Sequence, residues 1–81
     1  MKVYIVISNT VIYEHESHGL HGAYHKPEKA RSTAISVIKS IAKNNYFDVN
    51  DSDIINEDDT EFSYQNDTLG IWVSCIEQEV Y

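Results

Sequence analysis

Apolar residues recur at a helical spacing in one part of the chain only, residues 25–45. Ala30, Ala34, Val37, Ile38 and Ile41 lie at i, i+4, i+7, i+8 and i+11, which is one stripe of a helix with 3.6 residues per turn. The face opposite this stripe is basic and rich in hydroxyl groups, and it carries Lys29, Ser32, Ser36, Lys39, Ser40 and Lys43. The pattern predicts a helix that covers a core on one side and faces solvent on the other.

Both ends of this helix have recognisable signals. Pro27 suits a first turn, where its missing N–H removes no hydrogen bond, and Glu28 places negative charge at the positive end of the helix dipole. Lys43 is favoured near the other end for the opposite reason, and Asn44 and Asn45 tolerate the left-handed conformation that ends many helices.

The chain before the helix has strand patterns. Residues 3–7 are a continuous β-branched and aromatic run, and residues 10–13 have strand propensity again, so this second segment is either a hairpin return or an extension of the first strand through a bulge. Residues 14–19 are polar and predict a loop, and residues 20–24 predict a second strand. Gly22 within it indicates a bulge or a close backbone approach.

The chain after the helix begins with an acidic stretch, residues 48–59, which predicts a long surface loop. Residues 60–65 and 69–81 predict a hairpin, joined by a turn at Asn66 and Asp67. In the last strand one face carries Ile71, Val73 and Cys75, and the other carries Trp72, Ser74 and Ile76. We expect the helix to cover one of these faces and the other to be available to a partner.

The predicted fold is therefore α+β. The element order is β-β-α-β-β, with one mainly antiparallel four-stranded sheet and a single helix packed on one face. At 81 residues the chain predicts one domain, residues 1–81, close to the size at which oligomerisation helps a core to form. A homodimer is accordingly one expectation.

Charge is distributed unevenly over a net charge of −7. Residues 1–43 hold all six Lys and Arg against three acids, which gives +3, and residues 44–81 hold ten acids and no Lys or Arg, which gives −10. Such a field repels nucleic acid and favours a basic surface on a partner protein, although acidity also simply aids solubility.

Cysteine content and hydropathy indicate the cellular compartment in which the protein acts. Cys75 is the only cysteine, so an internal disulfide is excluded, and only five apolar residues follow Lys2, too few for a secretion signal. No apolar run approaches the roughly 18 residues of a membrane span. We expect a cytoplasmic protein without a membrane contact.

All four histidines of the chain, His15, His18, His21 and His25, lie within eleven residues. Imidazole is a common ligand of zinc, nickel and copper, so the cluster suggests a histidine-dependent metal or small-ligand module as an alternative function. On a strand, however, His21 and His25 would lie about 13 Å apart, too far to share one ion without a bend. A polar, histidine-rich segment is the preferred interpretation.

Signals for catalysis are weak. Cys75 lies in an apolar strand, where a free cysteine is usually a small core residue, and no glycine-flanked serine stands at a strand-to-helix elbow. We therefore expect no enzyme and no cofactor. Direct nucleic-acid binding by the basic helix face is opposed by the overall charge.

One resemblance adds a provenance. Gly22, Ala23 and Tyr24 end a strand, and Glu28, Lys29 and Ala30 open a helix, a pattern that resembles small uncharacterised phage and prophage proteins. The first strand, residues 1–7, and the acidic end, residues 76–81, are similar to theirs as well. The resemblance carries no catalytic residue. It implies a small inhibitor that acts in the host cytoplasm on defence complexes such as CRISPR nucleases.

The sequence thus predicts a non-enzymatic acidic binding protein, a phage-type, anti-CRISPR-like inhibitor that docks on a basic, nucleic-acid-handling host protein. Its acidic loop would imitate the phosphates of a nucleic acid. The expected contacts are Asp51, Asp53, Glu57, Asp58 and Asp59 with the aromatic residues Tyr46, Phe62, Tyr64 and Trp72. A self-associating accessory protein is the further alternative.

Overall fold

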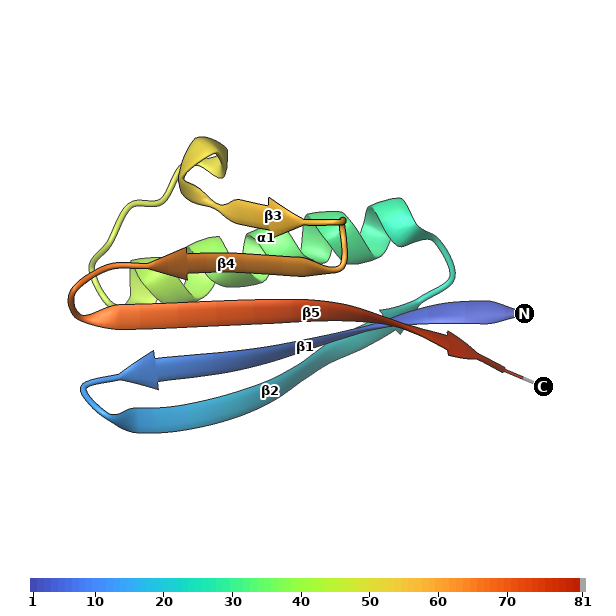
Figure 1. Ribbon diagram of the computed structural model, residues 1–81, viewed down its shortest axis with the longest axis horizontal. Helices are drawn as coiled ribbons and strands as arrows, with labels where there is room; N and C mark the ends of the chain where they lie inside the picture. Colours follow the sequence, from blue (N-terminus) through green and yellow to red (C-terminus); the bar gives the residue numbers. More distant parts are fainter. Residues whose placement is uncertain (81) are drawn as a thin grey trace.

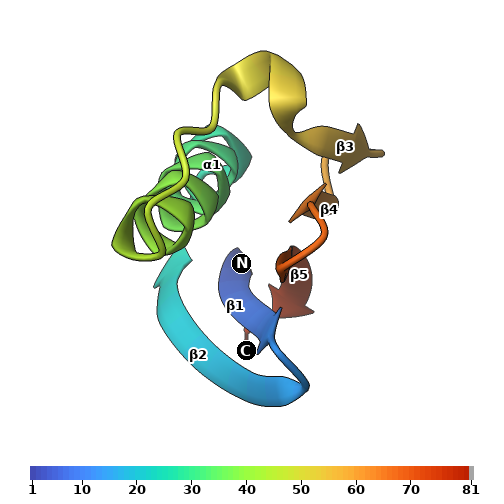
Figure 2. The same ribbon diagram turned by 90° about the vertical axis from the view of Figure 1, so that its left-hand side faces the viewer.

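The computed structural model describes residues 1–80, which form one curved antiparallel sheet with a helix on its concave side (Figures 1 and 2). The strands are β1 (Lys2–Ile12), β2 (His15–Tyr24), β3 (Ile55–Glu57), β4 (Glu61–Gln65) and β5 (Leu69–Glu79). The helix is α1 (Pro27–Asn44), and a short 3-10 turn, η1 (Asp51–Asp53), precedes β3. The strand order is β2-β1-β5-β4-β3, so β1 and β5 are central and β2 and β3 are the edges.

The two predicted segments at the start of the chain are one strand. β1 runs unbroken from Lys2 to Ile12 and pairs with β2 on one side and β5 on the other. The interpretation as an extension is therefore correct, but the bulge expected in it is not present in β1, whose register with β5 is continuous from Lys2 to Ile12. The alternative of a hairpin return at residues 10–13 is wrong. The reversal follows directly after β1, at Tyr13 and Glu14, which both have positive φ (49° and 70°).

The polar segment predicted as a loop is the first half of β2. Residues 15–19 pair with β1 from Ile12 back to Ser8. An edge strand has a neighbouring strand on one side only, so its polar side chains can stay in contact with water. The bulge predicted at Gly22 is confirmed. Gly22 pairs with Val6 and Leu20 with Ile7, which leaves His21 as the extra residue, and Gly22 has φ +122°.

The predicted helix is confirmed within one or two residues at each end. Ala30, Ala34, Ile38 and Ala42 are fully buried against the concave side of the sheet. The sheet residues of the same core include Val6, Phe62, Ile71 and Val73. Val37 and Ile41 lie at the β2 side of the helix and are only partly buried.

The sheet has five strands, so the predicted four-stranded sheet is wrong, although the α+β class with a single helix is confirmed. The additional strand is β3, which pairs with β4 from Ile55 opposite Ser63 to Glu57 opposite Glu61. Local polar groups order it. Asp58 and Asp59 adopt left-handed φ values of 54° and 55°, which a short polar side chain tolerates. The Asn56 side-chain amide donates to Asp59 Oδ1 at 2.9 Å.

The hairpin at the end of the chain is confirmed as β4 and β5, although Tyr81, the last residue of the predicted strand, lies outside the described residues. Ile71, Val73 and Cys75 face the helix and are buried. Trp72, Ser74 and Ile76 alternate with them and face the convex side of the sheet, as predicted. Figure 2 shows that side without a covering element.

Candidate binding surfaces

The acidic segment predicted as a docking site is ordered, and part of its charge is paired. Asp51 forms an ion pair with Lys39 of α1, and Arg31 Nη1 lies 3.1 Å from Asp59 Oδ1. Asp53 accepts a hydrogen bond of 3.0 Å from the backbone N–H of Asn50 and so caps η1. Two of the predicted carboxylates, Glu57 and Asp58, are exposed and make no ion pair with any of residues 1–80.

The structure does not bring the four predicted aromatic anchors together. Tyr46 is 97% exposed just after α1, and Tyr64 packs partly against the core. Trp72 lies on the convex side of the sheet. Phe62 is 1% exposed and belongs to the core, so it is not an accessible contact residue. Alternation in β4 places Phe62 on the helix side because its partner Val73 is there.

We call the convex side of the sheet the open face. It comprises the strand positions that alternate with the helix-facing ones: Val3, Ile5, Ile7, Asn9, Val11, Glu16, His18, Leu20, Ala23, Ile55, Glu57, Glu61, Ser63, Gln65, Gly70, Trp72, Ser74, Ile76 and Gln78. None of these positions is Lys or Arg. Apart from His18, the ionisable side chains of the open face are therefore all carboxylates.

Apolar side chains are exposed across the open face, both on the edge strands β2 and β3 and on the central strands β1 and β5. Leu20, Ile55 and Ile76 are 73%, 60% and 43% exposed, and Ile7 of β1 is 37% exposed. Trp72 lies over Gly70, because a Cβ at Gly70 would be 2.5 Å from its indole ring. Monomeric proteins rarely leave such groups of apolar side chains together on a surface without a partner.

A groove of about 450 Å³ crosses the open face between β2 and β4. Its lining includes Ile7, Asn9, Glu16, Glu61 and Trp72. Asn9 Oδ1 is buried there and accepts no hydrogen bond from residues 1–80. A buried acceptor without a donor costs about 1–3 kcal/mol, so this amide lowers the stability of the sheet.

Two carboxylates of the open face oppose each other directly. Glu57 of β3 and Glu61 of β4 are cross-strand partners. Like charges in this arrangement are destabilising, and neither carboxylate has a cation within ion-pair distance among the described residues. A basic group of a partner protein would relieve this repulsion.

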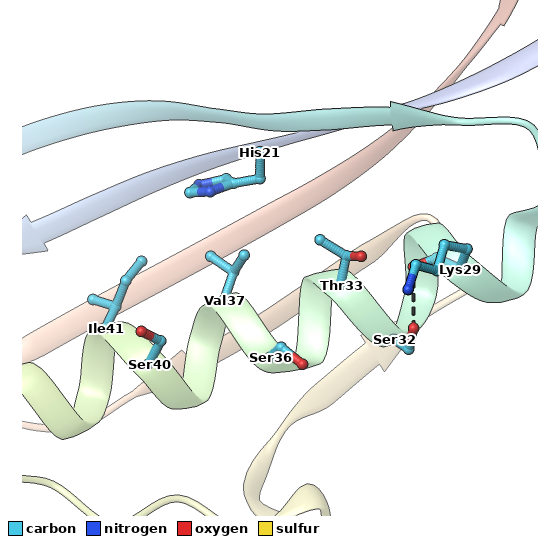
Figure 3. A pocket seen from close by; sticks show the side chains of 8 residues that line it. All are labelled: His21, Lys29, Ser32, Thr33, Ser36, Val37, Ser40 and Ile41. Atoms are coloured by element: carbon cyan, nitrogen blue, oxygen red, sulfur yellow. Dashed lines mark hydrogen bonds between the residues drawn. The ribbon is translucent and has the colours of Figure 1, made fainter.

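A second groove lies between α1 and β2, and Figure 3 shows the side chains that line one of its two hollows. Two adjoining hollows of about 350 and 330 Å³ share His21 and Ile41. His21 points from β2 toward the helix, and Thr33, Val37 and Ile41 point from α1 toward β2 (Figure 3). We call this space the α1–β2 groove. The hydroxyl-rich helix face forms its outer wall, at Ser32, Ser36 and Ser40.

The α1–β2 groove exists because the sheet under it lacks large apolar side chains. Helix-facing positions there are Ser8 and Thr10 of β1 and Ser17 and Gly19 of β2. Ser8 Oγ is 2.7 Å from His21 Nε2, so the imidazole is held against the floor of the groove. The sequence signal for this groove is the run of small polar residues at alternate strand positions, which the motif-based predictions do not include.

The strand places the four histidines on different sides. His15 pairs with Ile12 at the start of β2, His18 lies on the open face opposite Asn9, and His21 lies in the α1–β2 groove. His25 is exposed between β2 and α1. Within residues 1–80 no group of three or more His, Cys, Asp or Glu side chains is arranged to hold a metal ion.

Cys75 is a buried residue of β5. Its thiol lies 3.6 Å from the backbone carbonyl oxygen of Ala30, to which it donates a weak hydrogen bond. Burial raises the pKa of this thiol above its ordinary value of 9.0, which disfavours the reactive thiolate. The environment of Cys75 is that of a core residue.

Comparisons with protein families, curated proteins and solved structures find no match to this chain. The resemblance to phage proteins therefore stays a prediction. No helix in the described part of the chain is both long and apolar enough to cross a membrane.

Proposed function

We propose that this chain is a non-enzymatic binding protein that docks, through the open face of its sheet, on a basic surface of another protein. Because carboxylates on such a face can replace phosphates, the partner would be a nucleic-acid-handling protein. The phage proteins that the sequence resembles suggest a host defence complex as the target.

One observation carries this proposal: the open face combines exposed apolar side chains with carboxylates and has no Lys or Arg. An interface needs a desolvated apolar centre for affinity and complementary charge for orientation and speed of association. Ile7, Ile76 and Trp72 of the central strands supply the first, and Glu16, Glu57 and Glu61 supply the second. Five of the six Lys and Arg belong to residues 26–43, on or next to the helix.

We expect the contact with the partner to centre on the open face and not on the acidic segment alone. The acidic segment contributes its unpaired residues Glu57 and Asp58, while Asp51, Asp53 and Asp59 are engaged within the protein. In this proposal Trp72 remains an aromatic anchor, beside Ile7 in the groove of the open face. Nucleic acid itself would be repelled by this face.

The test is capture from a lysate of the candidate host on immobilised protein, with washes at low and at moderate salt. We expect a basic nucleic-acid-binding protein that elutes as salt rises and that added double-stranded DNA displaces, since both ligands would occupy one basic surface. Retention of proteins that are not basic, or retention insensitive to salt and DNA, would contradict the proposal.

A matched pair of variants distinguishes the effect of the open face on binding from the effect of the net charge. Glu57→Lys with Glu61→Lys and Glu28→Lys with Asp48→Lys change the net charge equally, but only the first pair lies on the open face. The first should abolish capture and the second should reduce it modestly. Equal effects would show that net charge alone attracts the partner.

A further inference from the structure

The α1–β2 groove has the features of a second binding site, on the opposite side of the sheet from the open face. We propose that an extended, acidic peptide segment of a partner protein binds here, adding to β2 as a strand and placing its side chains in the groove.

The first support is the backbone of β2. This strand is ten residues long and stands at the edge of the sheet, so one of its sides has no strand partner. Natural edge strands are commonly protected against pairing with another chain by a lysine, a proline or a covering element. The sequence of β2 contains no lysine and no proline. Its one irregularity is the bulge at His21, where the Tyr24 hydroxyl donates to the His21 carbonyl oxygen at 3.0 Å. Residues 15–20, before the bulge, are left for pairing.

The second support is the shape of the groove beside that edge. Its two hollows adjoin between β2 and α1, because His21 and Ile41 line both, and neither hollow is an enclosed cavity. A strand paired with β2 would direct every second side chain to the helix side. Val37 and Ile41 offer partly buried apolar contact there, and Ser8 and His21 offer polar contact at the floor.

The third support is charge. The chain has more than twice as many acids as Lys and Arg, yet neither hollow of the groove is lined by an Asp or a Glu. Lys29 lines one end and makes no ion pair with any of residues 1–80. The hydroxyls of Thr33, Ser36 and Ser40 can donate hydrogen bonds along the same wall. Carboxylate side chains are the groups that this wall would bind.

A second copy of this chain is a poorer occupant than an acidic peptide. The β2 strand itself has three histidines and one glutamate and does not supply the acidic side chains that the wall favours.

The experiment is selection of a displayed library of random peptides on the immobilised full chain and on two variants. Lys29→Glu reverses the charge in the groove, and Lys26→Glu makes the same change outside the groove lining. We expect the wild type and Lys26→Glu to enrich acidic peptides. Lys29→Glu should bind an enriched peptide roughly tenfold more weakly, a loss of about 1.4 kcal/mol.

Two further measurements test the strand geometry with an enriched peptide made synthetically. Methylation of alternate backbone nitrogens removes strand hydrogen bonds and should abolish binding, and the NMR amide shifts should map to residues 15–20 and to α1. Neutral or basic enriched peptides, undiminished binding of the methylated peptide, or shifts confined to the open face would overturn the proposal. A dimer paired through β2 in sedimentation would overturn it in favour of a second copy.

Peptide binding in the α1–β2 groove and partner binding by the open face can be tested independently of each other. The Glu57→Lys and Glu61→Lys pair should leave peptide binding unchanged, because both residues lie on the other side of the sheet.

Discussion

At the scale of single residues, the most informative arrangement is the carboxylate pair of Glu57 and Glu61. The two residues are opposite each other in β3 and β4, and both are exposed. Nothing in the hydrogen bonding of β3 requires a carboxylate there, because strand pairing uses the backbone. We therefore expect the pair to lower the stability of the isolated protein, as a surface kept for a basic partner would.

We expect Glu57→Gln to raise the free energy of unfolding by about 0.5 kcal/mol, since it removes a directly opposed like charge. The same change should weaken capture of a basic partner. Urea unfolding of the two proteins measures the first effect. Asp58→Asn, in the adjoining turn, is the control and should change stability less. A loss of stability in Glu57→Gln would mean that the carboxylate has a favourable role within the protein.

The position of one residue, Phe62, differs from the prediction made from the sequence. Phe62 is predicted as an interface anchor because it lies near the acidic segment along the chain. The register of β4 against β5 decides its position, and register places Phe62 opposite Val73 on the helix side. A shift of one residue would have exposed Phe62 instead. Composition alone does not contain that information.

At the scale of elements, α1 was predictable because its apolar stripe, its proline and its terminal charges agree with one another. The β1–β2 hairpin was not, because its turn residues are Tyr13 and Glu14, both with positive φ, and not the Asn-Gly or Asp-Gly pair that marks such turns. β3 was missed for a related reason. It is three residues long, and polar hydrogen bonds at Asn56 and Asp59 order it without an apolar pattern.

The bulge of β2 yields a prediction about Gly22. Its φ of +122° is disfavoured for any residue with a side chain, and a Cβ there would lie 2.9 Å from the Tyr24 hydroxyl oxygen. Gly22→Ala should therefore lower the free energy of unfolding by about 1–3 kcal/mol in urea titrations.

Gly19→Ala is the matched control for this prediction. Gly19 lies in the same strand, and a Cβ there would meet mainly the movable side chain of His21, at 3.0 Å. The control should cost less than Gly22→Ala. An equal or larger loss for Gly19→Ala would indicate that the groove floor, not the bulge, limits stability.

At the scale of the whole molecule, folding turns a division of charge between two halves of the sequence into a division between two sides of the sheet. The sequence predicts a basic first half and an acidic second half. In the fold, α1 carries most of the cations on one side of the sheet, and the open face carries carboxylates on the other. An acidic surface was thus predictable, but the exposed apolar side chains beside it were not, because β1, β2 and β5 bring Ile7, Leu20 and Ile76 onto one face from distant parts of the chain.

The net charge of −7 leads to a last prediction, that added salt stabilises this protein. The four ion pairs among residues 1–80, at the N-terminus, Lys2, Arg31 and Lys39, all involve exposed side chains, and such pairs contribute about 0–1 kcal/mol each. Repulsion among thirteen acids outweighs these pairs, and salt screens it as the Debye length falls from about 30 Å at 0.01 M to about 8 Å at 0.15 M. The Tm should rise over this interval in calorimetry at neutral pH.

The Glu57→Lys and Glu61→Lys variant provides the internal check. Each substitution replaces a negative charge with a positive one, so the net charge changes from −7 to −3, and the rise of Tm with salt should be smaller than in the wild type. A fall of the wild-type Tm with salt would mean instead that the surface ion pairs between α1 and the acidic segment contribute more than the repulsion costs. The acidic segment would then be held to the helix mainly by charge, and its carboxylates would be less available to a partner than we propose.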